Sequence, residues 1–381
     1  MKIPAYRVVL LIAFAAATLF FIFEMTTLPG KSPRAPAPQG FDLLDTLFRL
    51  VRNDYLEERD PVQTAEGAYR GLVDALDPLS AYLSSDLAGL FRSHGERDPE
   101  SGLIIYKKYG TFPQVLRVLQ ASPAEKAGLK PGDVISAING RNTLVMSLTE
   151  ANLMLKAGGK DKVRLKVLRG NDTVEYEVEK AVLSPDPFSI SSGHGKPRVL
   201  AVRRFSASLL PGLRKKVIPE LAKSSGPLVI DLRDADEGDF DAARDFVNLF
   251  IKTPSAGYFL KKGGVREEIA CPDEAGLPKT PLVVWVSQGT MGPAEFAAGL
   301  LQELKRARVV GQKTLGLAAR QTMFSLEDKS ALLLSSAAYH LPSDKTLWGA
   351  GLQPDAGLED EEPSDKAYLE KTLALIPDLI K

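Results

Sequence analysis

The stretch that decides the fold reads Ser-Pro-Ala-Glu-Lys-Ala-Gly-Leu-Lys-Pro-Gly-Asp-Val-Ile and occupies residues 122–135. Pro123 suits the first turn of a short helix, because that position needs no backbone N–H. Gly128 suits the end of the helix, where a left-handed residue is favoured. The following Pro-Gly-Asp is a turn signal that leads into a strand at 134–138, and the Asn-Gly at 139–140 is typical of a hairpin turn. The stretch therefore predicts a small β domain with a short helix between its strands.

The sequence on both sides completes this small domain. A glycine followed by apolar residues predicts a strand at 101–106. Apolar residues at helical spacing predict a helix between Leu148 and Leu155, and alternation predicts a final strand at 163–168. The whole pattern closely resembles a PDZ domain that spans residues 99–183.

The PDZ resemblance implies a peptide-binding site. PDZ domains capture peptides by strand addition, and their backbone amides receive a carboxylate or an extended backbone. A side chain at the glycine of this loop would block that close approach. We therefore expect C-termini or extended segments of peptides and proteins to bind at Gly102, Leu103, Ile104 and Ile105.

Strand and helix patterns alternate through residues 184–381, which argues for a layered α/β core. Residues 41–98 form a helical region, with helical periodicity at 41–55 and at 62–76. The chain is thus read as an α/β protein with a helical region, a PDZ domain of strands and short helices, and a layered core. The strands predicted in the core are 199–205, 227–232, 281–286, 308–311, 331–338 and 339–342, and the helices are 209–222, 240–250 and 293–304.

Four landmarks outside the PDZ segment resemble those of the carboxyl-terminal processing peptidases. They are Tyr-Arg-Gly-Leu-Val-Asp-Ala-Leu-Asp-Pro-Leu-Ser-Ala-Tyr-Leu at 69–83, Asp-Leu-Arg at 231–233, Ala-Arg-Val-Val-Gly-Gln-Lys-Thr-Leu-Gly at 307–316, and Gly-Leu-Gln-Pro-Asp at 351–355. The resemblance covers nearly everything after Phe41, in that family's order of helices, PDZ domain and core. It implies cleavage of peptide bonds by a serine nucleophile and a lysine base, which must be buried to lose its proton.

The two residues that should carry this chemistry are replaced. The family's nucleophile motif reads Ser-Ala-Ser-Ala-Ser-Glu, and this chain has Thr-Met-Gly-Pro-Ala-Glu at 290–295, which puts Gly292 at the nucleophile position. The family's lysine motif reads Thr-Phe-Gly-Lys-Gly, and this chain has Thr-Leu-Gly-Leu-Ala at 314–318, which puts Leu317 at the base position. Neither residue can give or accept a proton, and Leu317 predicts an apolar pocket where an amine would lie.

A third departure affects the backbone that should stabilise the oxyanion. The family reads Asp-Leu-Arg-Asn-Asn-Pro-Gly-Gly, and this chain has Asp-Leu-Arg-Asp-Ala-Asp-Glu-Gly at 231–238, so that Glu237 replaces the first glycine. Gln321 matches a glutamine that follows the family's lysine, but alone it has no chemical role. The nucleophile, the base and the oxyanion backbone all depart from the family pattern, which points to a catalytically inactive relative that binds peptides or partner proteins.

Two alternatives stay open. An active peptidase could use a relocated dyad, with Thr290 or Ser287 as nucleophile and Lys313 as base. The ordinary interpretation makes Thr290 a helix cap and Lys313 a solvated charge. The protein could also be an assembly partner that lends its PDZ domain to an active paralogue.

The N-terminus carries the pattern of an export signal. Lys2 and Arg7 precede an apolar run at 8–23, and a positive start before an apolar stretch directs a chain into a membrane. The residues after the run fit a cleavage site poorly, which favours an uncleaved single-pass anchor at 1–24 over a cleaved signal. The positive flank stays inside, so the body is expected on the periplasmic side of the cytoplasmic membrane. Residues 25–40 contain four prolines and predict an extended linker.

Composition limits the remaining function classes. Lys plus Arg and Asp plus Glu each number 48, and without a basic run no nucleic-acid partner is expected. A single cysteine, Cys271, excludes an internal disulfide. His94, His194 and His340 have no second histidine or cysteine at metal-ligand spacing, so no metal or other cofactor is expected.

Overall fold

The computed structural model describes residues 41–157, 162–183, 186–191, 197–221, 226–272, 280–360 and 362–380. The chain divides into two compact units, 1–65 and 66–381. The first unit contains helix α2 (Phe41–Asp54) and the start of α3 (Pro61–Asp74), which confirms the two predicted helices. Among the described residues, no helix has the length and apolarity needed to cross a membrane. The predicted anchor at 1–24 and linker at 25–40 lie outside the described residues.

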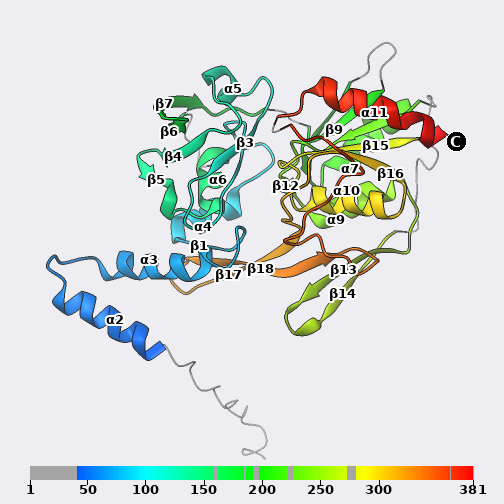
Figure 1. The fold of residues 1–381 in the computed structure, drawn as a ribbon. Helices are drawn as coiled ribbons and strands as arrows, with labels where there is room; N and C mark the ends of the chain where they lie inside the picture. The colour runs from blue at the N-terminus through cyan, green and yellow to red at the C-terminus, as the bar shows by residue number, and fades with distance from the viewer. Residues whose placement is uncertain are drawn as a thin grey trace, which may run out of the picture. The chain divides into compact units, whose positions relative to one another are not determined.

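The PDZ segment forms the predicted small β domain (Figure 1). Ser122 caps the short helix by accepting a hydrogen bond from the Glu125 N–H, and Gly128 ends it with φ +88°. Asn139 and Gly140 both have positive φ, as a type I′ hairpin turn requires. The sheet order is β2-β3-β4-β6-β7, with β5 beside β4. The elements are β2 (Leu103–Tyr106), β3 (Gln114–Val118), α5 (Pro123–Ala127), β4 (Val134–Ile138), β5 (Arg141–Asn142), a 3-10 turn (Thr143–Val145), α6 (Leu148–Lys156), β6 (Lys162–Arg169) and β7 (Asp172–Glu179).

The predicted final strand of this domain is not its last. Strand β7 follows β6 and pairs with it along its whole length. The sequence of β7 gives no clear strand pattern, because its side chains are mostly exposed and polar and only Val178 is buried in the domain core. Strand β3 was not predicted either.

The core contains a six-stranded sheet in the order β19-β16-β15-β11-β9-β8. Its central strands are parallel, and alternate residues face opposite sides. Helices α7, α9 and α10 pack on one face, while Tyr368 of α11 packs on the other against Val229, Val283 and Trp285 (Figure 1). The bounds are β8 (Phe188–Ser191), β9 (Arg198–Val202), α7 (Leu209–Lys216), α8 (Ile218–Leu221), β11 (Leu228–Asp231), α9 (Phe240–Asn248), β15 (Leu282–Val286), α10 (Pro293–Glu303), β16 (Ala307–Gly311), β19 (Ala356–Gly357) and α11 (Asp365–Ile380).

A second, mostly antiparallel sheet was largely missed. Its long strand β18 pairs with β1 and β13 on one edge and with β17 on the other, and β14 pairs with β13. The two strands predicted at 331–338 and 339–342 are this single strand. The bounds are β1 (Ala81–Leu83), β13 (Ser255–Lys261), a 3-10 turn (Lys262–Gly264), β14 (Arg266–Ala270), β17 (Ala319–Ser325) and β18 (Ala331–His340), and helix α4 (Ser85–Ser93) follows β1.

Two predicted elements are divided. The helix predicted at 209–222 breaks into α7 and α8 at Val217, because Pro219 has no N–H to continue the ladder. The strand predicted at 199–205 ends at Val202, and Arg204–Phe205 form a separate strand, β10, that pairs with β12 (Glu237–Gly238). This small pairing brings Glu237 beside Arg204.

Candidate functional site

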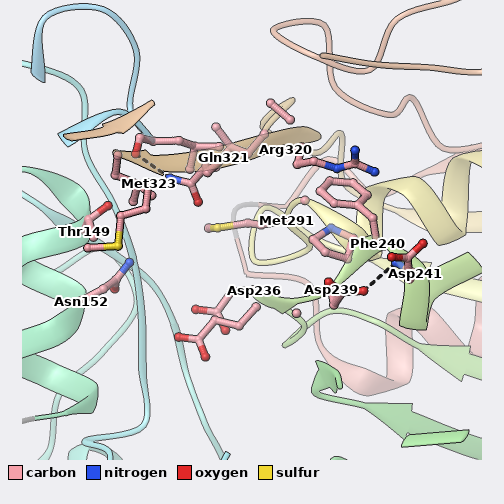
Figure 2. Close-up of a pocket in the computed structure, with 18 of the residues that line it drawn as sticks. Thr149, Asn152, Asp236, Asp239, Phe240, Asp241, Met291, Arg320, Gln321 and Met323 are labelled. Carbon is pink, nitrogen blue, oxygen red and sulfur yellow. Dashed lines mark hydrogen bonds between the residues drawn. The ribbon is translucent and has the colours of Figure 1, made fainter. Parts of the chain in front are cut away.

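A cleft of about 1060 Å³ lies in the second unit (Figure 2). Helix α6 of the PDZ segment supplies one wall, and strand β17 with Arg320, Gln321 and Met323 supplies another. The segment at 236–241 and the start of α10 complete it. Gly292 and Leu317, which were predicted to occupy the nucleophile and base positions, both line this cleft.

Gly292 sits on the turn between β15 and α10, with φ +53° and ψ −111°. A side chain rarely adopts this backbone conformation, which is one that strained functional turns use. A Cβ built at Gly292 would meet only the Leu317 carbonyl oxygen, at 3.7 Å. The two positions are therefore neighbours, and neither carries a group that can move a proton.

Glu295 holds these two positions together. Its carboxylate accepts hydrogen bonds from the N–H groups of Gly292 at 3.1 Å, Gly316 at 2.7 Å and Leu317 at 2.6 Å, and from the Thr314 hydroxyl at 2.5 Å. The side chain is fully buried, and burial raises the pKa of Glu295 to about 7 against the opposing effect of these donors. One carboxylate thus fixes the backbone at both Gly292 and Leu317.

The surroundings of Leu317 are apolar. Its side chain is 4% exposed and packs in a cluster with Ile104, Leu119 and Met291. The prediction of an apolar pocket at this position is confirmed. Because Ile104 comes from β2, the cluster joins the PDZ strand to the core.

The backbone next to Gly292 lacks a donor. In hydrolases with the nucleophile on a strand-to-helix turn, the N–H of the following residue donates to the oxyanion. Here that residue is Pro293, the first residue of α10, and proline has no N–H. The helical pattern predicts Pro293 only as the start of a helix, although the missing donor follows directly from proline at this position.

Glu237 is engaged in an ion-pair cluster. Its carboxylate contacts the Lys156 ammonium at 2.7 Å and the Arg204 guanidinium at 2.6 Å, and Asp236 contacts Lys156 at 2.5 Å. Burial disfavours the charge of Lys156, but the two carboxylates outweigh it and raise the pKa of that amine. Burial raises the pKa of Asp236 to about 6. This cluster ties α6 to the segment that the family resemblance assigns to the oxyanion site.

The cluster extends to His94, the residue that follows α4. Its Nε2 lies 3.8 Å from Glu237, and its Nδ1 lies 2.9 Å from Asp98. The hydrogen bond to Glu237 raises the pKa of His94 above its ordinary value, against the effect of burial. His340 instead stacks on Tyr258, and His194 lies outside the described residues. No group of three metal-binding side chains occurs among the residues that the structure describes.

The residues of the alternative dyad do not meet. Thr290 is buried, donates its hydroxyl to the Leu232 carbonyl at 2.8 Å and accepts from the Ser287 N–H at 3.0 Å. The Ser287 hydroxyl donates to the Arg233 carbonyl at 2.8 Å, and Lys313 is exposed. Both hydroxyls brace the loop, so the geometry gives the relocated dyad no support. Gln321 donates to the Leu79 carbonyl at 2.7 Å, as an ordinary hydrogen-bonding residue does.

The four predicted peptide-binding residues of the PDZ segment are buried. Leu103 and Ile105 face the domain core, and Ile104 is 1% exposed against Met291 and Leu317. A Cβ at Gly102 would lie 2.2 Å from the Ser122 Cβ, so the fold itself requires glycine there. Strand β2 is nevertheless an edge strand of its sheet, the arrangement that strand addition needs.

Comparison with known proteins agrees with this architecture. Residues 200–358 match peptidase family S41, and residues 114–169 match the PDZ domain. The fold is that of a PDZ-containing peptidase of this type. The chain carries a peptidase family S41 domain and a PDZ domain, and its homologues are carboxyl-terminal processing proteases.

Two such homologues match most of the chain. The carboxyl-terminal-processing protease of Synechocystis sp. is 27% identical over 358 residues, which cover 87% of this chain and 84% of that protein. The carboxy-terminal processing protease CtpA of Bacillus subtilis is 25% identical over 374 residues, which cover 97% and 80%. The solved photosystem II D1 C-terminal processing protease has the same fold, with a TM-score of 0.69 and 23% identity over 87% of this chain and 90% of that one.

Proposed function

We propose that this protein is a peptide-binding pseudopeptidase of the carboxyl-terminal processing type. The observation that carries the proposal is that Gly292 and Leu317, which the motif comparison assigns to the positions of nucleophile and base, are neighbours in the cleft. Without a hydroxyl and an amine, the dyad chemistry has neither a nucleophile nor a base. Pro293 and Glu237 support the proposal further, because they change the backbone donors that an oxyanion needs.

The cleft supports binding as the retained activity. It keeps a large volume, an apolar wall that includes Leu317 and Met291, and polar groups along β17. A large concave site of this composition is the usual place for a ligand. The edge of β2, at Gly102–Ile105, is proposed as a second peptide site, which a ligand reaches when Ile104 is released from the core.

Location and partners belong to the same proposal. The apolar run at 8–23 and its positive flank support a single-pass anchor in the cytoplasmic membrane, with the body on the periplasmic side. A protein that holds peptides there without cutting them would serve as a capture module, alone or beside an active paralogue. No observation favours the relocated dyad as a second function.

The test measures cleavage and binding on the same sample. Full-length protein in detergent micelles is mixed with a labelled unfolded protein and with labelled peptides that have apolar C-termini. We expect saturable binding and no turnover, because loss of a nucleophile removes about 10⁶ in rate. Turnover that disappears in Thr290→Ala or Lys313→Ala, but not in the exposed control Lys345→Ala, would establish the relocated dyad instead.

A further inference from the structure

Met291, Gly292 and Leu317 all line the cleft and form an apolar part of its wall, here called the Gly292 recess. The space in front of Gly292 is open, because a Cβ there would have a single neighbouring atom within 4 Å outside its own chain neighbours. Met291 and Leu317 are 7% and 4% exposed, so their side chains form a fixed apolar lining. A recess of this kind gains free energy when an apolar side chain fills it.

We infer that the Gly292 recess is an anchor pocket for an aliphatic side chain in the interior of an extended peptide. The inference rests on the proposed peptide-binding function and names the ligand of the cleft. The positions that carry catalysis in an active peptidase become, in this chain, the part of the cleft that selects what is bound.

Glu295 makes the pocket rigid and excludes a terminal carboxylate. Its carboxylate accepts hydrogen bonds from the N–H groups of Gly292 and Leu317. These bonds keep the distance between the two residues fixed when the recess is empty. The N-terminus of a helix such as α10 would otherwise attract an anion. Here the Gly292 N–H already donates to the Glu295 carboxylate, and Pro293 has no N–H to donate. A peptide C-terminus next to the recess would therefore find no free backbone N–H at Gly292 or Pro293.

Strand β17 supplies the means to hold an extended backbone. It lines the cleft through Ala319, Arg320, Gln321 and Met323 (Figure 2). One edge pairs with β18, and the other edge pairs with no strand in the part of the chain that the structure describes. An edge strand beside a side-chain pocket is the arrangement by which a peptide binds as an added strand, with alternate side chains in pockets.

The charges of the cleft select the residues that flank the anchor. Six carboxylates line it, at Asp236, Glu237, Asp239, Asp241, Glu267 and Glu268, against the cationic groups of Lys156, Arg244 and Arg320. Asp239 and Glu268 are exposed and have no basic partner among the described residues. Lysine or arginine on either side of the anchor would therefore meet a complementary surface.

The experiment uses fluorescence anisotropy of the full chain in detergent micelles. The probe is a labelled eight-residue peptide with blocked ends, a lysine near each end and a central leucine. Three matched peptides carry a central asparagine, glutamates in place of the lysines, or the leucine at a free C-terminus. Burying one leucine changes Kd by about 10-fold or more. We expect the asparagine peptide to bind at least that much more weakly, and the glutamate and free-carboxylate peptides also to bind more weakly.

Two variants test the pocket itself. Gly292→Ala fills the recess and should raise Kd for the leucine peptide to that of the asparagine peptide. Gly264→Ala is the matched control, because that glycine also has a positive φ, has open space around it and does not line the cleft. If Gly292→Ala fails to fold, Leu317→Asn keeps the side-chain size and should remove the preference for leucine. Thermal unfolding checks each variant.

The outcomes separate this inference from the function it rests on. Equal binding of the leucine and asparagine peptides would overturn the anchor pocket and leave peptide binding intact. The anchor pocket is overturned as well if the leucine preference survives both Gly292→Ala and Leu317→Asn, or if the free-carboxylate peptide binds most tightly. No binding of any of the four peptides would overturn the pocket and the proposed function together.

Discussion

Restoring the dyad should not restore full activity, and Pro293 is the reason. The double variant Gly292→Ser, Leu317→Lys places a hydroxyl and an amine on neighbouring positions, since a Cβ at residue 292 would lie 3.7 Å from the Leu317 carbonyl oxygen. The apolar cluster around Leu317 would lower the pKa of the introduced amine, as a base requires. Glu237 is already engaged by Lys156 and Arg204, so it does not hold the amine protonated.

The double variant still lacks a backbone N–H at residue 293 that could donate to the oxyanion. Removing one such donor costs about 10²–10³ in kcat, or roughly 3–4 kcal/mol. A triple variant that adds Pro293→Ala returns an N–H to the first residue of α10. We expect Gly292→Ser alone to be inert, the double variant to show trace activity, and the triple variant to exceed the double by about 10²-fold.

The assay is kcat/KM for a labelled peptide, with labelling of the new hydroxyl by a fluorophosphonate as an independent readout. Pro342→Ala is the control, because this exposed proline lies away from the cleft. Activity in the double variant equal to that of the triple variant would refute the argument from Pro293. Activity of Gly292→Ser alone would refute the argument from Leu317.

Three further predictions concern stability and location. Lys156→Gln leaves Asp236 and Glu237 without their shared cation and should lower the free energy of unfolding by about 3–5 kcal/mol in urea denaturation, whereas the exposed Lys313→Gln should change it by less than about 0.5 kcal/mol; an equal effect of the two variants would contradict the ion-pair cluster. Because burial raises the pKa of Glu295 from 4.5 to about 7, the folded chain holds a proton there that the unfolded chain releases, so this residue's contribution to stability falls as pH rises from 4.5 to 7. Glu295→Gln should make the free energy of unfolding depend less on pH between 4.5 and 7 than it does in the natural chain. An equal pH dependence of the two proteins would refute the raised pKa of Glu295. Protease added to spheroplasts should degrade the body of the protein, which should stay in the membrane fraction; a soluble form that starts near Gln39 would refute the anchor.

The buried parts of the fold were the predictable ones. Strands β11 and β15 are apolar apart from Asp231 at the end of β11, and their predicted positions differ from the observed ones by one residue at each end or less. Strands β13, β14 and β17 were missed because their signal is not local. β14 reads Arg-Glu-Glu-Ile-Ala, and it is held by pairing with β13 and by the Glu267–Arg320 ion pair between residues 53 apart.

The candidate site was also predictable only in part. Motif comparison found Gly292, Leu317 and Glu237, because flanking residues fix their register. The contact between Lys156 and Glu237 joins residues 81 apart, and nothing in either local sequence indicates it. Glu295 served only as a register marker, although three backbone N–H groups converge on it. Long-range polar contacts such as these follow from the packed tertiary structure.

The three departures from the peptidase pattern should all raise the stability of the fold, because each removes a strained or unfavourable feature of an active site. Glycine at residue 292 removes the conflict between a side chain and a positive φ, which amounts to about 1–3 kcal/mol. Leucine at residue 317, where the family resemblance expects a desolvated amine, is a side chain that suits its apolar cluster. Glu237 turns a glycine-lined backbone into one side of an ion-pair cluster with Lys156 and Arg204. In the proposed pseudopeptidase cleavage is not required, so stability favours all three changes, and the cleft is present with all three in place. On this proposal the site keeps its shape for binding without its reactive groups, so the dyad-restoring variants should be less stable than the natural chain as well as poorly active.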